Sequence, residues 1–368
     1  MPPFSAGDGD RCWIIAEAGV NHDGDADKAL RLIDVAADAG ADAVKFQTFV
    51  PEELMSRLAP KAGYQLRATD AGESQLDMVR KLRLSEAEHH RLAEACARRG
   101  IRFLSTPFDL PSLAFLVGEL GLETLKLSSG EVTNAPLLLA AARSGRRIIL
   151  STGMATEEEV REALGVLAFG MLGGASPSRP AFAAAFATEE GKAALADKVA
   201  LLHCTTEYPA PCTDVNLRAM DTLRDVFGLP VGLSDHTEGI AIPIAAAARG
   251  ARIVEKHFTL DRTLPGPDHR ASLNPDELRA MVAGIRAVEA ALGSPVKAPA
   301  PSEIGNIAVA RKSLVTRRPV RAGEILTPDM LTAKRPGTGI SPMRLWDLLG
   351  TTARRDYAPD EQLDAEVR

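Results

Sequence analysis

Two histidines, His236 and His257, stand where short apolar runs of the sequence end, and they are the strongest candidates for metal ligands. Imidazole nitrogens bind catalytic divalent ions, and a site with two protein histidines leaves positions open for water and substrate. Glu17 near the N-terminus and Asp268 in the segment after His257 are carboxylates that we expect beside such an ion. These residue types predict a catalytic divalent metal site.

Two lysines, Lys45 and Lys126, also end apolar runs and are candidates for binding an anion. A lysine that points into the interior of a fold is costly unless it meets a negative partner. Ser128-Ser129-Gly130 and Ser151-Thr152-Gly153 supply hydroxyls and flexible backbone that can donate to phosphate oxygens. Together they predict a phosphate or phospho-carboxylate ligand. One of the lysines could instead form a Schiff base with a carbonyl substrate, and the sequence leaves that alternative open.

Glu17 and Glu131 are the acid–base candidates, because a carboxylate beside a metal and a phosphate can activate or orient a water molecule. The alternative for each is a structural ion pair with one of the two lysines. Cys204 is a weaker candidate for a nucleophile, since no base stands beside it in the sequence.

Eight short β-branched or apolar runs precede these polar residues and alternate with stretches of helical period. The runs are Cys12–Ala18, Ala43–Thr48, Arg102–Thr106, Thr124–Ser128, Arg147–Ser151, Val199–Cys204, Val231–Ser234 and Arg252–His257. This alternation predicts βαβ units, and eight units predict an α/β fold of the TIM type, a (β/α)8 barrel. Because the carboxyl ends of barrel strands meet on one face, we expect the polar clusters to form one active site.

The stretches between the runs carry helix signals. Asp25–Gly40 has apolar residues at helical spacing and stops at glycine, and Ser85–Gly100 begins with a capping box. Asn274–Leu292 opens with a proline, which suits the first helical position. His89 and His90 fall within the second stretch, where we expect them to be solvated.

The chain is expected to divide near residue 293. Residues 1–292 would form the barrel, with an insertion of surface helices at about 167–198, where the alternating rhythm is lost. Residues 293–305 are rich in proline and predict a semi-rigid linker. Residues 306–368 change to short β-like pieces and turn signals, which predicts a small β-rich domain.

Length, charge and composition exclude several classes of protein. The 368 residues suit one barrel-sized domain plus a small one. A net charge of -6 argues against general binding to nucleic acid, which needs a concentrated basic surface. No signal peptide and no uncharged apolar run of membrane-spanning length is found, so no membrane partner is expected. The four cysteines show no paired spacing, which favours reduced thiols and a cytoplasmic location.

The motifs around these residues resemble those of the sialic acid synthase family. They are Glu17-Ala-Gly-Val-Asn-His22, Val44-Lys-Phe-Gln-Thr48, Ser105-Thr-Pro-Phe108, Lys126-Leu-Ser-Ser-Gly-Glu131, Leu150-Ser-Thr-Gly-Met154, His203-Cys-Thr-Thr-Glu-Tyr-Pro209, Gly232-Leu-Ser-Asp-His-Thr237, Glu255-Lys-His-Phe258 and Gly266-Pro-Asp268. The segment Lys334-Arg-Pro-Gly-Thr-Gly339 resembles the C-terminal antifreeze-like (SAF, β-clip) domain of that family. The likeness runs from about residue 11 to the end of the chain.

The resemblance implies a transferase that joins phosphoenolpyruvate to N-acetylmannosamine and water, giving N-acetylneuraminate and phosphate by C–O cleavage. It implies that His236 and His257 hold Mn²⁺ or Mg²⁺, which would polarise the sugar aldehyde. Glu131 would position or deprotonate the water that adds to the former enol carbon. The residues expected to take part in catalysis are Glu17, Lys45, Glu131 and Asp268.

The resemblance also assigns residues to the two substrates. Phosphoenolpyruvate would be bound by Lys45, Thr106, Lys126, Ser129, Ser151 and Ser234. The sugar or the metal-bound water would be contacted by Glu17, Gln47, Tyr208 and Asp268. Thr206 stands near the phosphate, where some family members carry asparagine. The family forms a domain-swapped homodimer in which each C-terminal domain covers the partner's barrel, and Arg335 would reach the acyl-amino group of the sugar.

Three alternatives stay open at this point. N,N'-diacetyllegionaminate synthases share nearly all these motifs and use 2,4-diacetamido-2,4,6-trideoxymannose, so the sequence does not separate the two activities. A 3-deoxy ulosonate synthase that uses a phosphorylated aldose would need a second phosphate site, and no spare cluster of Lys and Arg provides one. A non-catalytic sugar- or ice-binding protein is opposed by the presence of Glu131, both lysines and both histidines.

Overall fold

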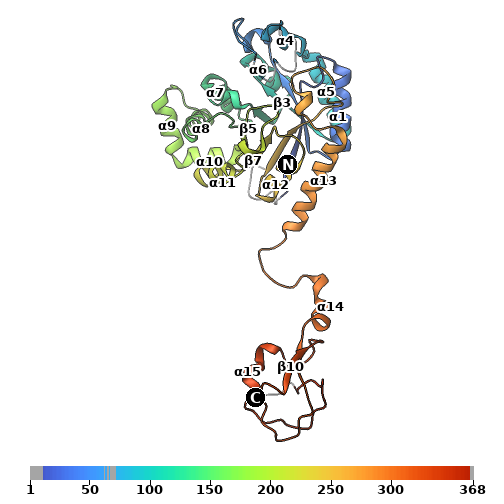
Figure 1. Cartoon of the computed structure of the whole chain (residues 1–368). Helices are drawn as coiled ribbons and strands as arrows, with labels where there is room; N and C mark the ends of the chain where they lie inside the picture. Colours follow the sequence, from blue (N-terminus) through green and yellow to red (C-terminus); the bar gives the residue numbers. More distant parts are fainter. Residues whose placement is uncertain (1–10, 62, 64–65, 67–71, 365–368) are drawn as a thin grey trace. The chain divides into compact units, whose positions relative to one another are not determined.

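The computed structural model describes residues 11–61, 63, 66 and 72–364, which belong to two compact units (Figure 1). Unit 1 ends at Gly293, and unit 2 begins at Ser294. Each unit has apolar clusters made of its own residues, so each is described separately below.

Unit 1 is built around eight parallel strands. They are β1 (Trp13–Gly19), β2 (Ala43–Thr48), β3 (Arg102–Pro107), β4 (Thr124–Leu127), β5 (Arg147–Ser151), β6 (Val199–Cys204), β7 (Val231–Asp235) and β8 (Ile253–His257). Their hydrogen-bonded order is β3-β2-β1-β8-β7-β6-β5-β4, so the first strand pairs with the last. β3 and β4, at the two ends of this order, contact each other and bring the sheet round to a barrel. The predicted TIM-type fold is confirmed, and each predicted run lies within one residue of a strand.

Helices cover the outside of this sheet, as Figure 1 shows. The helices on the outside are α1 (Ala26–Asp38), α5 (Glu86–Arg99), α6 (Leu110–Gly118), α7 (Ala135–Arg143), α8 (Glu157–Met171), α9 (Arg179–Ala187), α10 (Glu189–Lys198), α11 (Ala219–Phe227), α12 (Ala241–Ala248) and α13 (Pro275–Leu292). Two further helices of unit 1, α2 (Pro51–Leu54) and α4 (Gln75–Lys81), belong to the segment between β2 and α5. The predicted capping box of α5 is present: the Ser85 hydroxyl accepts from the Glu88 backbone, and the Glu88 carboxylate accepts from the Ser85 backbone.

One histidine of α5 was wrongly expected to be solvated. His89 is buried, with one ring nitrogen 2.9 Å from the Thr48 hydroxyl and the other 2.9 Å from the Ser85 carbonyl oxygen. The expectation failed because two adjacent histidines on a helix give no periodic signal for which of them faces the sheet. His90 beside it is exposed, as expected.

The core of unit 1 has two apolar layers on the two faces of the sheet. Inside the barrel, alternate strand residues form a small cluster that includes Trp13, Ile15, Ile149 and Leu202. Between the sheet and the helices, a larger cluster gathers the outward residues of the strands, such as Val254, with the inner faces of the helices. A strand that is buried on both faces explains why the eight runs read as almost continuously apolar.

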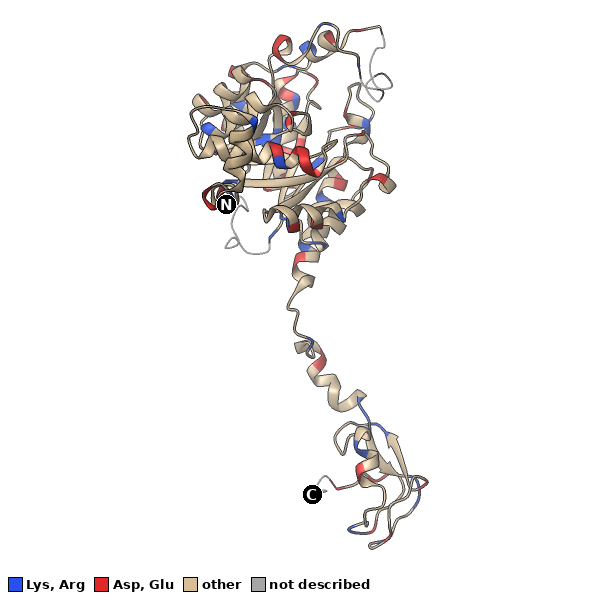
Figure 2. Cartoon of the chain, turned by 90° about the vertical axis from the view of Figure 1, so that its left-hand side faces the viewer, with Lys and Arg blue, Asp and Glu red and all other residues tan. Residues whose placement is uncertain are grey.

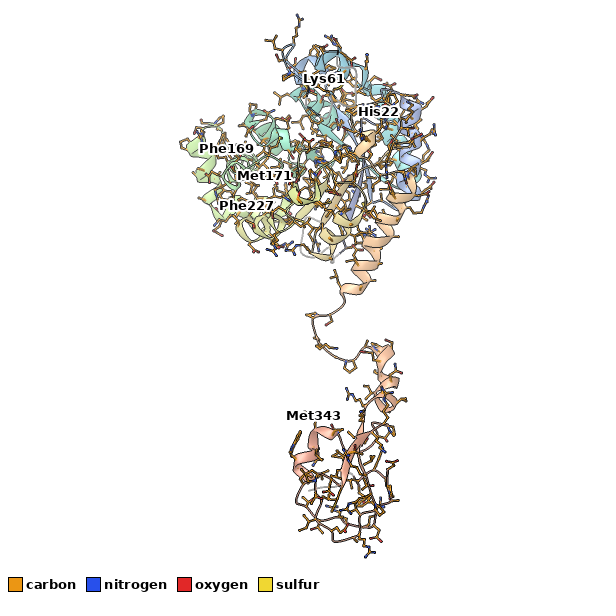
Figure 3. All side chains as sticks on the ribbon, in the orientation of Figure 1. His22, Lys61, Phe169, Met171, Phe227 and Met343 are labelled. Atoms are coloured by element: carbon orange, nitrogen blue, oxygen red, sulfur yellow. The ribbon has the colours of Figure 1, made fainter. Side chains whose placement is uncertain are left out.

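The segment after α8 adds α9 and α10, which pack against α8 on the outside of the barrel. The rings of Phe169 and Phe182 meet edge-on, with centroids 5.2 Å apart. Phe186 of α9 contacts Phe227 of α11 in the same way, at 6.5 Å. Figure 3 shows Phe169, Met171 and Phe227 on this side of unit 1. The segment is therefore ordered by aromatic packing on the outside of the barrel.

Unit 2 contains a small antiparallel sheet, as predicted for a β-rich tail. α14 (Pro301–Ala310) precedes β9 (Ser313–Thr316) and β10 (Leu331–Lys334), and α15 (Leu345–Leu348) follows. Its core includes Leu314, Val320, Leu331 and Tyr357. Met343, labelled in Figure 3, and Trp346 are exposed.

Residues of both charges are distributed along the ribbon of unit 1. Figure 2 shows segments with Lys and Arg interspersed with segments that carry Asp and Glu. In the part of the chain that the structure describes, no helix is both long enough and apolar enough to cross a membrane.

Candidate active site

The inward-facing residues of the barrel change from apolar to polar toward the carboxyl ends of the strands. In β2, apolar Ala43 is followed two residues later by charged Lys45. In β8, apolar Ile253 is followed at the same spacing by Glu255 and then His257. Side chains two residues apart on a strand share a face, so the polar residues form a layer directly above the apolar cluster. This layer lines a cavity of about 240 Å³.

Nearly all the predicted site residues meet in this cavity. Its lining includes Glu17, Lys45, Gln47, Thr106, Lys126, Ser129, Ser151, Thr206, Tyr208, Ser234, His236, His257 and Asp268. Two predicted residues are not in the lining. Glu131 lies in the short 3₁₀ helix that follows β4, where its carboxylate accepts from the Asn134 amide at 2.6 Å. Arg335 belongs to unit 2, where its side chain donates to the Ala310 carbonyl at 3.0 Å.

Four buried charged groups form an alternating network at the floor of the cavity. Lys45 Nζ lies 2.8 Å from Glu17 Oε2 and 3.7 Å from Glu255 Oε2, and it donates to the Thr106 hydroxyl at 3.1 Å. Lys126 Nζ lies 3.4 Å from Glu255 Oε1. The four side chains are each at most 4% exposed, so both lysines meet the negative partners that burial requires.

The network shifts the pKa of each member. Burial raises the pKa of Glu17 to about 7, against the opposing effect of the Lys45 ammonium. Burial also acts to raise the pKa of Glu255, but the two lysines bring it down to about 2. Burial lowers the pKa of Lys126, whereas the two carboxylates outweigh burial at Lys45 and raise its pKa. The two lysines thus favour the charged form of Glu255, which lies between them, whereas burial favours the protonated form of Glu17.

Small hydroxyls without partners line the same cavity as the lysines. Among the described residues, the Ser151 and Thr206 hydroxyl oxygens are buried and have no hydrogen-bond partner. The Ser129 hydroxyl accepts from the Gly153 backbone at 2.8 Å. A Cβ atom at Gly153 would lie 2.4 Å from the Thr206 hydroxyl and 2.9 Å from that of Ser129, so only glycine allows this approach. Unpaired buried hydroxyls in one cavity with two ammonium groups are suited to bind the oxygens of an anion.

The two predicted metal-ligand histidines lie next to each other. Their ring centroids are 5.4 Å apart, and the Tyr208 ring packs against His236 at 4.1 Å. Asp268 Oδ2 lies 3.9 Å from His257 Nδ1, and burial raises the pKa of Asp268 to about 6. Burial holds the pKa of His257 well below its usual value, so its ring is neutral and able to bind a cation.

A divalent ion fits the chemistry of these two rings. His236 Nδ1 lies 2.8 Å from the Thr205 carbonyl, which can only accept, so Nδ1 carries a proton and Nε2 is the nitrogen that could bind an ion. His257 Nδ1 is buried and has no hydrogen-bond partner among the described residues. Within the same residues, no group of three or more His, Cys, Asp or Glu is arranged to hold an ion. His236 and His257 therefore suit a divalent ion that has these two protein ligands and coordination positions open to water or substrate.

Two residues of the cavity were missed or misjudged from the sequence. No role was predicted for Glu255. Because it lies two residues before His257 on the same strand, both side chains face the cavity, and the alternation of strand residues could have indicated this. Nothing in the sequence indicated that Cys204 Sγ lies 3.7 Å from His236 Nδ1, although that nitrogen donates to the Thr205 carbonyl and is not free to act as a base. That neighbour comes from the next strand of the sheet and is distant in sequence.

One wall of the cavity is apolar, which the sequence did not predict. The residues of this wall are Val20, Phe49, Leu54, Met55, Met78, Val79, Leu82 and Phe108. They form a single cluster, in which the segment that carries α2 and α4 packs over the ends of β1, β2 and β3. The cavity thus has a charged floor and an apolar side, which suits a ligand with an anionic end and an apolar group.

Two family models match the chain. The model of the NeuB family matches residues 32–297, and the model of the SAF domain matches residues 311–366. The first match contains the cavity-lining residues of β2 to β8, and the second contains the sheet of unit 2.

Relatives match over nearly the whole chain. The N,N'-diacetyllegionaminic acid synthase of Campylobacter jejuni is 48% identical, with 95% of this chain and 97% of the relative covered. The protein of the same name from Legionella pneumophila is 43% identical over 92% of this chain and 90% of the relative. A crystal structure of the N-acetylneuraminic acid synthetase of Leptospira borgpetersenii, in complex with citrate, is 37% identical. It aligns with a TM-score of 0.66 over 81% of this chain and 91% of the other.

Proposed function

Because this chain belongs to the NeuB family and carries a SAF domain, we propose that it condenses phosphoenolpyruvate with an N-acylated amino sugar and water. The products would be a nine-carbon keto acid sugar and phosphate. Family membership makes the chain a synthase of the sialic and legionaminic acid type, as the motifs predicted. The observation that carries the proposal is the meeting of two buried lysines, two partnerless hydroxyls and two imidazoles in one cavity.

The sugar that we propose is 2,4-diacetamido-2,4,6-trideoxymannose, which the motifs had placed second to N-acetylmannosamine. Both legionaminic acid synthases described above favour it. The apolar wall supports it independently, because this sugar has a methyl group at C6 where N-acetylmannosamine has a hydroxymethyl group. A buried hydroxyl without a partner is penalised, whereas a buried methyl group is favoured.

At the floor of the cavity, the lysines and hydroxyls would bind phosphoenolpyruvate. Lys126 and Lys45 provide positive charge, and the Ser151 and Thr206 hydroxyls are free to donate to its oxygens. Glu255 offsets part of this charge and fixes both ammonium groups, so the anion meets a site that is already organised.

At the mouth of the cavity, the other residues would orient the sugar. A divalent ion, Mn²⁺ or Mg²⁺, held by His236 and His257 would supply Lewis-acid polarisation of the aldehyde that the enol carbon attacks. We propose that Gln47, Tyr208 and Asp268 contact the sugar hydroxyls. The role of Glu131 in orienting the water stays a prediction, since its carboxylate is engaged by Asn134.

Phosphate release tests this function. We expect phosphate from phosphoenolpyruvate only when the sugar and a divalent ion are both present, and loss of activity with a chelator. The value of kcat/KM should be about tenfold or more higher for the trideoxy sugar than for N-acetylmannosamine, the size of effect that one group in an apolar pocket produces. N-acetylmannosamine 6-phosphate completes the panel.

The same assay separates the competing outcomes. Phosphoenolpyruvate labelled with ¹⁸O at the bridging position should give labelled phosphate, because the C–O bond breaks. Label retained in the sugar acid would contradict the proposed chemistry. Equal rates with both unphosphorylated sugars would remove the assignment of the apolar wall and keep the rest.

We also propose that the protein is a domain-swapped homodimer and works in the cytoplasm. Unit 2 exposes Ile304, Val309, Met343 and Trp346, an unusual number of large apolar side chains for so small a unit. A second copy of the chain would cover them, as the family resemblance implies. The four cysteines are free thiols, which suits a reducing compartment.

Truncation after Leu292 tests the role of unit 2. We expect the truncated protein to fold, because the apolar clusters of the barrel consist of unit 1 residues alone. KM for the sugar should rise by about tenfold, the loss expected for one hydrogen bond to a charged group such as Arg335, and the dimer should become a monomer. Steady-state kinetics and light scattering measure the two effects. Arg335→Ala in the full chain should reproduce the kinetic effect without the change in mass, and unchanged sugar kinetics in both proteins would reject the lid role.

A further inference from the structure

We propose that Lys256 is a positioning residue that fixes the backbone on both sides of His236 and thereby sets the metal-binding geometry of the site. The inference rests on the proposed function, because it concerns the ion that His236 and His257 would hold. Lys256 faces away from the cavity and has no part in binding substrate. It is fully buried, at 0% exposure.

The position of Lys256 in the sheet explains why it can act on both histidines. It lies in β8 between Glu255 and His257, whose side chains face the cavity, so its own side chain faces the helix layer. Its backbone neighbour across the sheet is Asp235, the last residue of β7. His257 therefore follows Lys256 directly, and His236 follows the partner of Lys256 directly.

The Lys256 ammonium contacts the residues that flank His236. It lies 2.6 Å from Asp235 Oδ2, and it donates to the carbonyl oxygen of Thr237. Asp235 in turn accepts from the Thr237 backbone N–H at 3.1 Å and from its hydroxyl at 3.0 Å. His236 is thus the central residue of a closed turn, and the ammonium holds both ends of that turn.

Burying the Lys256–Asp235 ion pair removes its hydration, which destabilises the fold unless other contacts compensate for the loss. An ammonium without water requires charged and polar partners, and replacing such a pair by apolar residues of similar size is often neutral or stabilising. The partners here are the two residues on either side of a proposed ligand. Groups behind metal-binding histidines set the ring orientation, and their loss lowers metal affinity by about 10–100-fold.

Binding of Mn²⁺, followed by electron paramagnetic resonance of the free ion, tests the proposal in the full chain without substrate. Lys256→Met should raise the Kd for Mn²⁺ by about 10–100-fold. The double variant Asp235→Leu/Lys256→Met replaces the ion pair by apolar side chains. It should regain thermal stability relative to Lys256→Met, but its Kd should stay raised, because the turn around His236 has lost its anchor.

A matched control comes from the other end of the barrel. Asp42, just before β2, accepts from Arg286 at 2.7 Å and from the Ile14 backbone at 2.8 Å. Asp42→Asn should lower the melting temperature and leave the Kd for Mn²⁺ unchanged. A raised Kd in Asp42→Asn would mean that any loss of fold stability weakens Mn²⁺ binding, and this would overturn the positioning role of Lys256.

The remaining outcomes separate this proposal from the proposed function. If His236→Ala binds Mn²⁺ as the unaltered protein does, both the metal assignment and the role of Lys256 are wrong. If His236→Ala loses the ion while Lys256→Met keeps the original Kd, the positioning role alone is rejected. A double variant that recovers both stability and Kd would show that the ion pair only stabilises the fold. The double variant also decides the question if Lys256→Met does not fold.

Discussion

Replacing His236 by alanine should lower kcat by about a thousandfold or more at saturating phosphoenolpyruvate and sugar. Polarisation of the aldehyde by an ion contributes several kcal/mol to the transition state, and about 1.36 kcal/mol corresponds to a tenfold change in rate. His236 offers one ring nitrogen to the ion because the other is bound to the Thr205 carbonyl. Phosphate release in the presence of Mn²⁺ measures the effect.

His90→Ala is the matched control for this variant. His90 is an exposed histidine of α5 whose ring contacts only Phe115 among the aromatic rings described, at 5.7 Å, and it is outside the cavity lining. We expect its kcat to match that of the unaltered protein. Substantial activity of His236→Ala that persists with a chelator would remove the Lewis-acid assignment.

Replacing Lys126 by methionine should raise KM for phosphoenolpyruvate by about 10–100-fold. A hydrogen bond to a charged group contributes about 1.5–3 kcal/mol, which corresponds to that range. The loss is enlarged because Glu255 would keep its negative charge beside the incoming anion with only Lys45 to offset it. Initial rates at saturating sugar and calorimetric binding of phosphoenolpyruvate alone measure the change.

Lys192→Met provides the control for a lost surface charge. Lys192 is exposed on α10 and pairs with Glu189, so its removal should leave KM for phosphoenolpyruvate unaltered. The anion site would be misassigned if Lys126→Met changed KM for the sugar and left binding of phosphoenolpyruvate intact.

The barrel could be predicted from the sequence because its strands are buried on both faces. Such strands are uninterrupted apolar runs, and each run predicted the bounds of its strand to within a residue. The site followed from the same reasoning, since the polar residues at the ends of the runs meet wherever the strands close into a barrel.

The features that could not be predicted depend on contacts between distant segments. The apolar wall joins Val20, Phe49, Met78 and Phe108 through folding of the segment that carries α2 and α4, and no periodicity in the sequence marks it. The hydrogen bond from the Asn134 amide to the Glu131 carboxylate was likewise not visible in the sequence, and the role of Glu131 stays a prediction. The contact of Cys204 with His236 joins adjacent strands and leaves no trace in local sequence.

A crystal structure with Mn²⁺ and phosphoenolpyruvate bound would test the central claim most directly, because anomalous scattering locates the ion without reference to activity. The account predicts one manganese peak bonded to His236 and His257, with the phosphoenolpyruvate oxygens on Lys45, Lys126 and the Ser151 hydroxyl. A peak elsewhere, or an anion bound away from both lysines, would contradict it.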